Sequence, residues 1–211
     1  MTTAGATPIF QDIFAEQWDI LPPAMKAHYA NRSFSNDRVV VSGHLTIRMG
    51  PLLLLASPVL KVLKMLTPWA GDDVPCTVTF RSEPDSRAFI FERRFHFPGH
   101  APYVFRSKMI PQGPHEVIEY MAGGIGWRCG YVYENDRVLL QHRGYVWRIF
   151  GVDIPLSWMG ECLLGRGDAF EEATGEDRFR MRMTLGGGLF GRLTEYSYEG
   201  EFTVTDIQYA E

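Results

Sequence analysis

Hydrophobic and polar positions alternate along most of the chain after Cys76. In the run 89–97, for example, Phe89, Phe91, Arg93 and Phe95 share one face of an extended chain. This alternation is typical of β-strands that bury one face. Similar runs cover 38–49, 76–81, 103–110, 115–121, 126–134, 137–149, part of 160–173, 178–185 and 193–205. The pattern therefore predicts about nine or ten strands.

The turns between these runs are short and polar, for instance at 83–86, 98–100, 111–114 and 134–136. Strands joined by such turns run antiparallel, because a parallel connection needs a dozen or more residues. A meander of this many strands favours a strongly curved sheet or a closed barrel, since closure removes exposed strand edges. We predict a mainly β (α+β) protein of lipocalin-like architecture.

The first third of the chain is expected to be helical, apart from the strand at 38–49. Phe10, Phe14 and Trp18 recur at helical spacing, and Pro22 and Pro23 suit the first turn of a second helix. We therefore expect a single domain over 1–211, with a helical part at about 8–70 and an antiparallel β part at about 75–206. The helices would cover one end or one face of the barrel.

Residues 52–66 are strongly apolar and begin and end on Leu52 and Leu66. The run is shorter than the about 20 residues that a membrane-spanning helix needs, and it contains Pro58, Lys61 and Lys64. On one helix the two lysines would lie in a narrow polar stripe, so most of the circumference would have to be buried. A core helix packed on the sheet is the preferred interpretation. The alternatives are a lid over an apolar pocket and a helix resting on a bilayer surface.

Composition and motif spacing exclude several classes of protein. The 211 residues carry a net charge of −4, so nucleic acid is not an expected partner. Three cysteines without a CxxC pair, and no basic and apolar leader, predict a reduced, cytoplasmic protein. The histidines lack metal-ligand spacing, no GxSxG motif is present, and the glycines at 186–191 precede a strand pattern rather than the helix of a dinucleotide site. We therefore expect no metal and no cofactor.

Ionisable residues inside apolar strands are the candidates for chemistry. Glu119 or His142, enclosed in an apolar interior, could act as a general acid or base, with Arg94 as an electrostatic stabiliser. The simpler interpretation of each candidate is a solvated residue, since one side of an antiparallel strand usually faces water. Further candidates, for binding a polar group of a ligand, are Arg93, His44, His96 and Arg143.

Several short motifs occur in a fixed order along the chain: DVPCTV at 73–78, FERRF at 91–95, FRS at 105–107, VIE at 117–119, DIP at 153–155 and YEG at 198–200. This order resembles the bacterial domain of unknown function family 4166. Family members that stand alone or are appended to dehydrogenase-like domains imply a role in small-molecule metabolism, without an assigned activity. The polar residues that match the family pattern are Arg93, Arg94, Ser107, Glu119 and Glu171, so the resemblance adds Ser107 to the ligand-binding candidates. The histidines that do not match it are His44, His96 and His142.

Three classes of function fit the sequence. The 14 Phe, nine Tyr, five Trp and nine Met favour the first, binding of a hydrophobic small molecule or lipid in a cavity between barrel and helices. The second is a cofactor-independent isomerase, lyase or hydrolase that acts on a hydrophobic or aromatic molecule in the same cavity. The third is a module that docks on a dehydrogenase partner or touches a membrane through residues 52–66. A homodimer interface would also use the aromatic residues.

Overall fold

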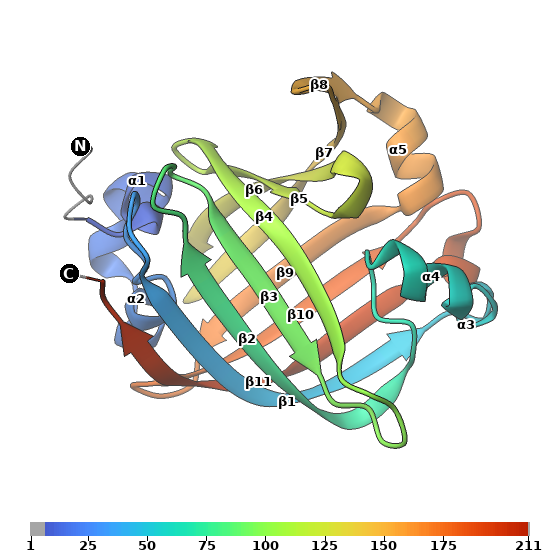
Figure 1. Cartoon of the computed structure of the whole chain (residues 1–211), viewed down its shortest axis with the longest axis horizontal. Helices are drawn as coiled ribbons and strands as arrows, with labels where there is room; N and C mark the ends of the chain where they lie inside the picture. The colour runs from blue at the N-terminus through green and yellow to red at the C-terminus, as the bar shows by residue number, and fades with distance from the viewer. Residues whose placement is uncertain (1–6, 211) are drawn as a thin grey trace.

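Ten antiparallel strands close into a barrel in the computed structural model of the chain (Figure 1). The structure describes residues 7–210, without the side chain of Leu63. In order around the ring the strands are β1 (Arg38–Met49), β2 (Gly71–Ser82), β3 (Phe89–Phe95), β4 (Tyr103–Gly113), β5 (Glu116–Tyr120), β6 (Ile125–Glu134), β7 (Arg137–Ile149), β9 (Arg166–Ala173), β10 (Arg178–Gly186) and β11 (Tyr196–Gln208). Pairing of β11 with β1 completes the ring.

The predicted fold class is confirmed, and β1 and β7 begin and end at the predicted residues. The glycines at 186–191 lie where β10 turns towards its antiparallel neighbour β11, as the strand pattern after them indicates. One strand, β8 (Val152–Pro155), was not predicted. It pairs with residues 146–149 at the C-terminal end of β7 and lies outside the ring.

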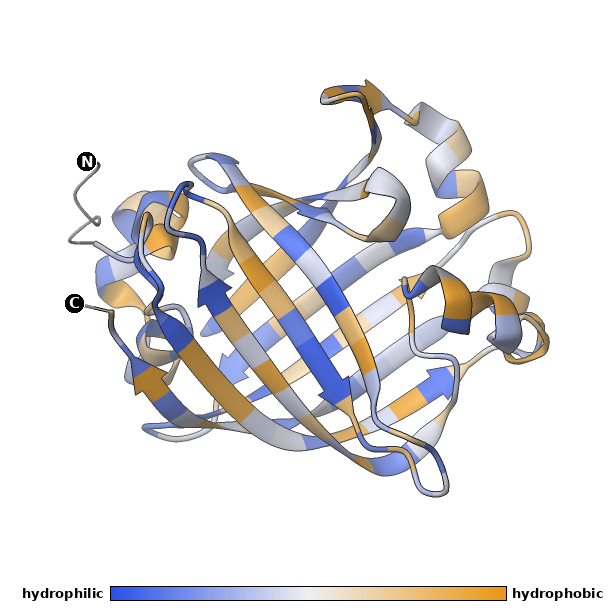
Figure 2. Cartoon of the chain, in the orientation of Figure 1, coloured by the Kyte–Doolittle hydropathy of each residue, from blue (hydrophilic) through white to orange (hydrophobic). Residues whose placement is uncertain are grey.

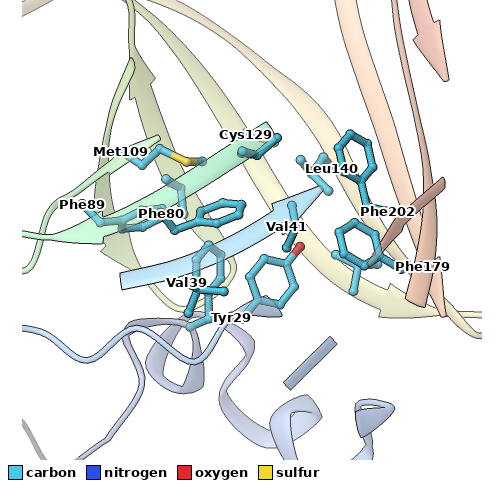
Figure 3. Packing of buried hydrophobic residues seen from close by; sticks show 14 of the residues in the cluster. Tyr29, Val39, Val41, Phe80, Phe89, Met109, Cys129, Leu140, Phe179 and Phe202 are labelled. Carbon is cyan, nitrogen blue, oxygen red and sulfur yellow. The ribbon is translucent and has the colours of Figure 1, made fainter. Parts of the chain in front are cut away.

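Alternation along the strands decides which side chains enter the barrel. In β3, Phe89, Arg93 and Phe95 are buried, whereas Arg94 between them is exposed. The hydropathy colours of Figure 2 change in the same way along the barrel wall. The core is rich in aromatic rings, and Figure 3 shows Tyr29 reaching into it beside Val39, Val41 and Phe80.

Three short N-terminal helices plug one end of the barrel: α1 (Ile9–Phe14), the 3-10 helix η1 (Ala15–Ile20) and α2 (Pro23–His28). The prediction of a helix beginning at Pro22–Pro23 is confirmed. The predicted helix through Trp18 is instead split after Phe14, because Ala15 takes a positive φ of 49°. The ring of Phe10 packs against Tyr29 at a centroid distance of 4.1 Å and seals the plug.

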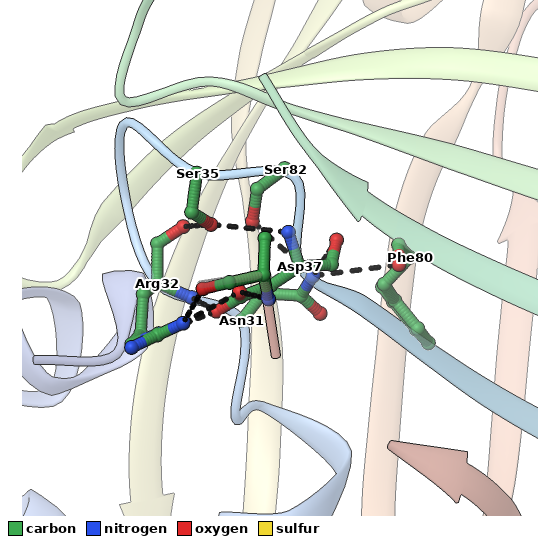
Figure 4. Close-up of polar contacts among 7 residues, drawn as sticks. Asn31, Arg32, Ser35, Asp37, Phe80 and Ser82 are labelled. Carbon is green, nitrogen blue, oxygen red and sulfur yellow. Dashed lines mark hydrogen bonds and ion pairs between the residues drawn. The ribbon is translucent and has the colours of Figure 1, made fainter. Parts of the chain in front are cut away.

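The loop between α2 and β1 is held by a buried polar network around Asp37 (Figure 4). The Asp37 carboxylate accepts hydrogen bonds from Arg32 N at 3.0 Å and Nε at 2.7 Å, both to Oδ2, and from Arg32 Nη2 at 2.9 Å and Ala210 N at 2.8 Å, both to Oδ1. Asn31 Nδ2 donates to the Asp37 carbonyl and to Ser82 Oγ. The network ties the plug to β2 and to the residues after β11.

Residues 52–66 do not form the expected core helix. Residues 52–63 lie in two short helices, α3 (Pro51–Leu55) and α4 (Ser57–Leu63), which meet at Ala56, two residues before Pro58. No residue of α3 is buried, and Leu60 is the buried residue of α4 among the side chains that the structure describes. The core interpretation is wrong because the barrel fills its core with strand residues, which leaves these helices at its rim.

The end of the barrel opposite the plug carries α3, α4, α5 (Ser157–Leu164) and the 3-10 helix η3 (Gly191–Thr194) (Figure 1). A third 3-10 helix, η2 (Ala122–Gly124), connects β5 to β6. Helix α5 was not predicted, since its eight residues show little separation of apolar and polar faces. Over residues 7–210, every helix is too short or too polar to cross a bilayer.

Candidate functional site

A cavity of about 240 Å³ lies inside the barrel. Its inner end is closed by Phe10 and Tyr29 of the plug, and Leu53, Leu60 and Leu164 line its outer end. The wall between them is mainly aromatic and aliphatic. Such a cavity is close to the lower end of the range of ligand pockets, roughly 300–1,000 Å³.

One polar cluster in the wall joins the three strands β3, β4 and β5. Arg93 Nη2 donates to Glu119 Oε1 at 3.0 Å, and Ser107 Oγ donates to the same oxygen at 2.6 Å. Arg93 Nη1 donates to Ser107 Oγ at 3.3 Å. The guanidinium carbon lies 3.5 Å from the centroid of the Phe91 ring and 4.8 Å from that of Phe105. Aromatic faces and a carboxylate therefore hold the buried cation in one orientation.

The charge state of this cluster follows from its surroundings. Burial lowers the pKa of Arg93, but the charge and hydrogen bond of Glu119, together with Tyr198 and Cys76, outweigh burial and leave that pKa above its usual value. Burial raises the pKa of the Cys76 thiol to about 12, against the effect of Arg93. Arg93 is therefore a permanent cation beside neutral groups, and its charge is balanced by Glu119.

A second polar cluster lies where α2 meets β9. The Tyr29 hydroxyl donates to Glu171 Oε2, and His28 Nε2 lies 3.5 Å from the same oxygen. His28 Nδ1 is buried and has no hydrogen-bond partner among the described residues. Burial, followed by the charge of Glu171, raises the pKa of Tyr29 well above its usual value. Tyr29 therefore stays a hydrogen-bond donor, and the His28 ring offers one further polar atom.

His142 is buried in β7 but does not line the cavity. Its Nδ1 accepts a hydrogen bond from Trp127 Nε1 at 3.0 Å, which requires Nδ1 to be unprotonated. Its Nε2 lies 3.4 Å from Glu161 Oε1. Burial lowers the pKa of His142, and the opposing effect of Glu161 does not restore it. His142 is a neutral residue that supports Trp127, and Trp127 lines the cavity.

This assignment predicts a loss of stability in mild acid. The folded protein favours neutral His142, so its contribution is present above the ordinary histidine pKa of about 6.5 and is lost as the pH falls through the lower folded pKa. We expect the melting temperature to fall less steeply between about pH 7 and pH 5 in His142→Gln than in the unmodified protein. The exposed His96→Gln change is the control and should leave the slope unchanged. Equal slopes in all three proteins would contradict the assignment.

The remaining predicted residues lie on the outer face. The alternation that directs Arg93 inwards directs Arg94 outwards, where its Nη2 lies 3.5 Å from Glu92 Oε1. Arg143 also lies on the outer face, where its Nη1 is 3.8 Å from Glu116 Oε2. Four of the predicted site residues are exposed and lie outside the cavity: His44, His96, Arg94 and Arg143. The expectation that Arg94 acts beside Glu119 in one cavity is therefore wrong. Of the predicted residues, Arg93 and Glu119 line the cavity together. Ser107 is not in the cavity lining but is hydrogen-bonded to both of them.

Sequence reasoning did not select His28 and Tyr29 as site residues. They end a helix whose spacing predicts only a plug, and nothing in the sequence places that helix end under β9. Glu171 was marked by the family pattern alone. No group of three or more possible metal ligands is found among residues 7–210.

Comparisons with known proteins add a family and two distant structures. The family model described as Domain of unknown function (DUF4166) matches residues 21–202. The dehydratase domain of the polyketide PpsC from Mycobacterium tuberculosis is 10% identical over 87% of this chain and 80% of that chain, with a TM-score of 0.19. A dehydratase from type I polyketide synthases is 12% identical over 87% and 84%, with a TM-score of 0.18. These TM-scores are too low to indicate a shared fold. No curated protein sequence matches this chain.

Proposed function

This chain belongs to the family described as Domain of unknown function (DUF4166), a description that names no reaction, and we propose that it binds a small, mainly apolar molecule or a lipid inside its barrel. The observation that carries the proposal is the cavity of about 240 Å³, which has aromatic and aliphatic walls and a few buried polar groups. Apolar walls supply affinity through burial, and a few placed polar groups fix orientation.

The polar groups suggest an amphipathic ligand rather than a pure hydrocarbon. Both hydrogen bonds that fix Glu119 use its Oε1, so Oε2 can accept a bond from a ligand hydroxyl. His28 Nδ1 is a second buried atom that can bond to a ligand. Since Arg93 is already balanced by Glu119, a neutral hydroxyl, carbonyl or protonated carboxyl group fits better than a second anion.

Filling the cavity tests this proposal. Ala169 lines the cavity from β9, and Ala169→Phe places a ring in the ligand's space. We expect this change to weaken binding of the apolar probe N-phenylnaphthylamine at least about tenfold while the barrel remains folded. The control is Ala101→Phe in the exposed connection between β3 and β4. Undiminished probe binding by a folded Ala169→Phe protein would refute the proposal.

A second candidate function is a cofactor-independent acid–base enzyme, favoured by the Glu171, His28 and Tyr29 cluster. These groups lie in the cavity and can accept, hold and donate a proton at one place. The trio expected from sequence, Glu119, His142 and Arg94, does not converge. Turnover of a cavity-bound ligand that is abolished in Glu171→Gln, with its binding retained, would support the enzyme. A ligand recovered unchanged from both proteins would exclude it for that ligand.

A further inference from the structure

Large apolar side chains are exposed around the open end of the barrel. We define the mouth rim as residues 51–66, 157–166 and 187–195, which include α3, α4, α5 and η3. Leu55 is 78% exposed, Val62 79%, Trp158 71% and Leu189 73%. Monomeric proteins rarely expose many large apolar side chains at one place without a partner for them.

Backbone hydrogen bonds make the mouth rim one continuous surface. Leu189 N donates to Cys162 O at 2.7 Å and joins the loop of η3 to α5. Gly50 N donates to Glu195 O at 2.7 Å and joins the same loop to the start of α3. Leu53 and Leu164 belong to the mouth rim and also line the cavity. The exposed apolar surface therefore continues directly into the interior.

The charge of the mouth rim differs from that of the chain as a whole. Its ionisable side chains are the basic Lys61, Lys64, Arg166 and Arg192 and the acidic Glu161 and Glu195. The mouth rim is thus positive in a chain whose net charge is −4. Exposed apolar residues beside lysine and arginine are typical of surfaces that lie in the interface of an anionic bilayer.

We propose that the mouth rim docks on an anionic lipid bilayer, so that the cavity exchanges its ligand with the lipid phase. The short helices α3, α4 and α5 would lie in the plane of the interface, with Leu55, Val62 and Trp158 among the acyl chains and the lysines at the headgroups. A docked mouth shields an apolar ligand from water as it moves between the two apolar environments. This inference rests on the proposed function of the cavity.

Co-sedimentation with vesicles tests the docking surface. The probes are vesicles of phosphatidylcholine alone and of an equimolar mixture with phosphatidylglycerol. We expect binding to the anionic vesicles, weaker binding to the neutral ones, and a decrease as salt concentration rises. Trp158→Glu should weaken binding at least about tenfold, and Lys61→Glu with Lys64→Glu about thirtyfold or more.

Matched controls lie at or near the plugged end. Ile20 is 65% exposed on η1, and Arg178 is exposed at the start of β10. Ile20→Glu and Arg178→Glu repeat the two kinds of change outside the mouth rim and should leave vesicle binding unchanged. Absence of binding to anionic vesicles would overturn the proposal, as would equal losses in mouth-rim and control variants. A dimer in solution that Trp158→Glu dissociates would assign the mouth rim to a second copy and would also overturn it.

A second readout separates this inference from the proposed function. The part of N-phenylnaphthylamine binding that Ala169→Phe abolishes without vesicles reports on the cavity, and Lys61→Glu with Lys64→Glu should not change that part. Probe binding without vesicle binding would remove the docking surface and leave the cavity function standing. Vesicle binding by the unmodified protein with no probe binding would remove the cavity function and, with it, the exchange of ligand.

Discussion

Replacing Arg93 with methionine should lower the free energy of unfolding by about 3–5 kcal/mol. The substitution leaves the Glu119 carboxylate buried without its cation, while the methionine chain fills much of the same space between Phe91 and Phe105. A buried, unpaired charge costs far more than the loss of the pair's own attraction. Urea unfolding followed by circular dichroism measures the change.

Two further variants identify the cause. Arg93→Met with Glu119→Leu removes both charges and should recover most of the lost stability, since an apolar replacement of a buried pair is often neutral. Arg106→Met breaks the exposed Glu92–Arg106 pair between β3 and the neighbouring β4 and should cost at most about 1 kcal/mol. If the double variant is as unstable as Arg93→Met, the cost comes from packing and the electrostatic explanation is wrong.

The double variant also tests the proposed polar contact between the ligand and Glu119. It should still bind an apolar probe, but it should no longer prefer a probe that carries a hydroxyl group.

Asp37→Asn should destabilise the barrel by about 3–5 kcal/mol, although the amide has nearly the same shape as the carboxylate. Asp37 is fully buried, and its two oxygens accept four hydrogen bonds from Arg32 and from the backbone of Ala210. An amide nitrogen cannot accept the bonds made to one of these oxygens. The change therefore leaves the Arg32 cation poorly paired and loosens the connection between the plug and the end of β11.

The same residue gives a pH dependence. Burial tends to raise the pKa of Asp37, but the bonds from Arg32 and from the Ala210 backbone outweigh burial and hold that pKa below its usual value. Its contribution is therefore present above the ordinary aspartate pKa of about 3.9 and is lost as the pH falls through the lower folded pKa. Asp37→Asn should remove this part of the acid destabilisation, whereas Asp206→Asn, in the exposed pair with Arg38, should not. Parallel acid unfolding of the Asp37→Asn and unmodified proteins would contradict the assignment.

The barrel was predictable because alternation is a local property that burial imposes on every strand. The residues Phe89, Arg93 and Phe95 had to share a face whatever the tertiary structure. Which face turned inwards was not local, since both faces of β3 carry apolar and charged residues. Closure of the ring directs Arg93 towards Glu119 and Arg94 towards solvent. The sequence could therefore name both arginines and could not choose between them.

The cluster around Glu171 was beyond sequence reasoning for a different reason. Its members are the last residue of α2, the residue that follows it, and Glu171 of β9, so they are separated by most of the chain. Spacing rules detect groups that one element brings together, and this group exists only after the plug has entered the barrel. The prediction of a core helix for residues 52–66 was wrong for another reason. Their apolar composition indicated burial, but they lie at the mouth, and hydrophobicity alone does not distinguish a core from a docking surface.

Because the ring closes through the pairing of β1 with β11, we expect this pairing to form late in folding. One partner of β1 is β2, which follows it closely in the sequence. The other partner is β11, which begins more than 140 residues after β1 ends. Contacts between such distant segments form slowly, because a long loop must close before they contribute. During synthesis on the ribosome the edge of β1 therefore stays unpaired, and this row of free amide and carbonyl groups is where misassembly of nascent chains should begin.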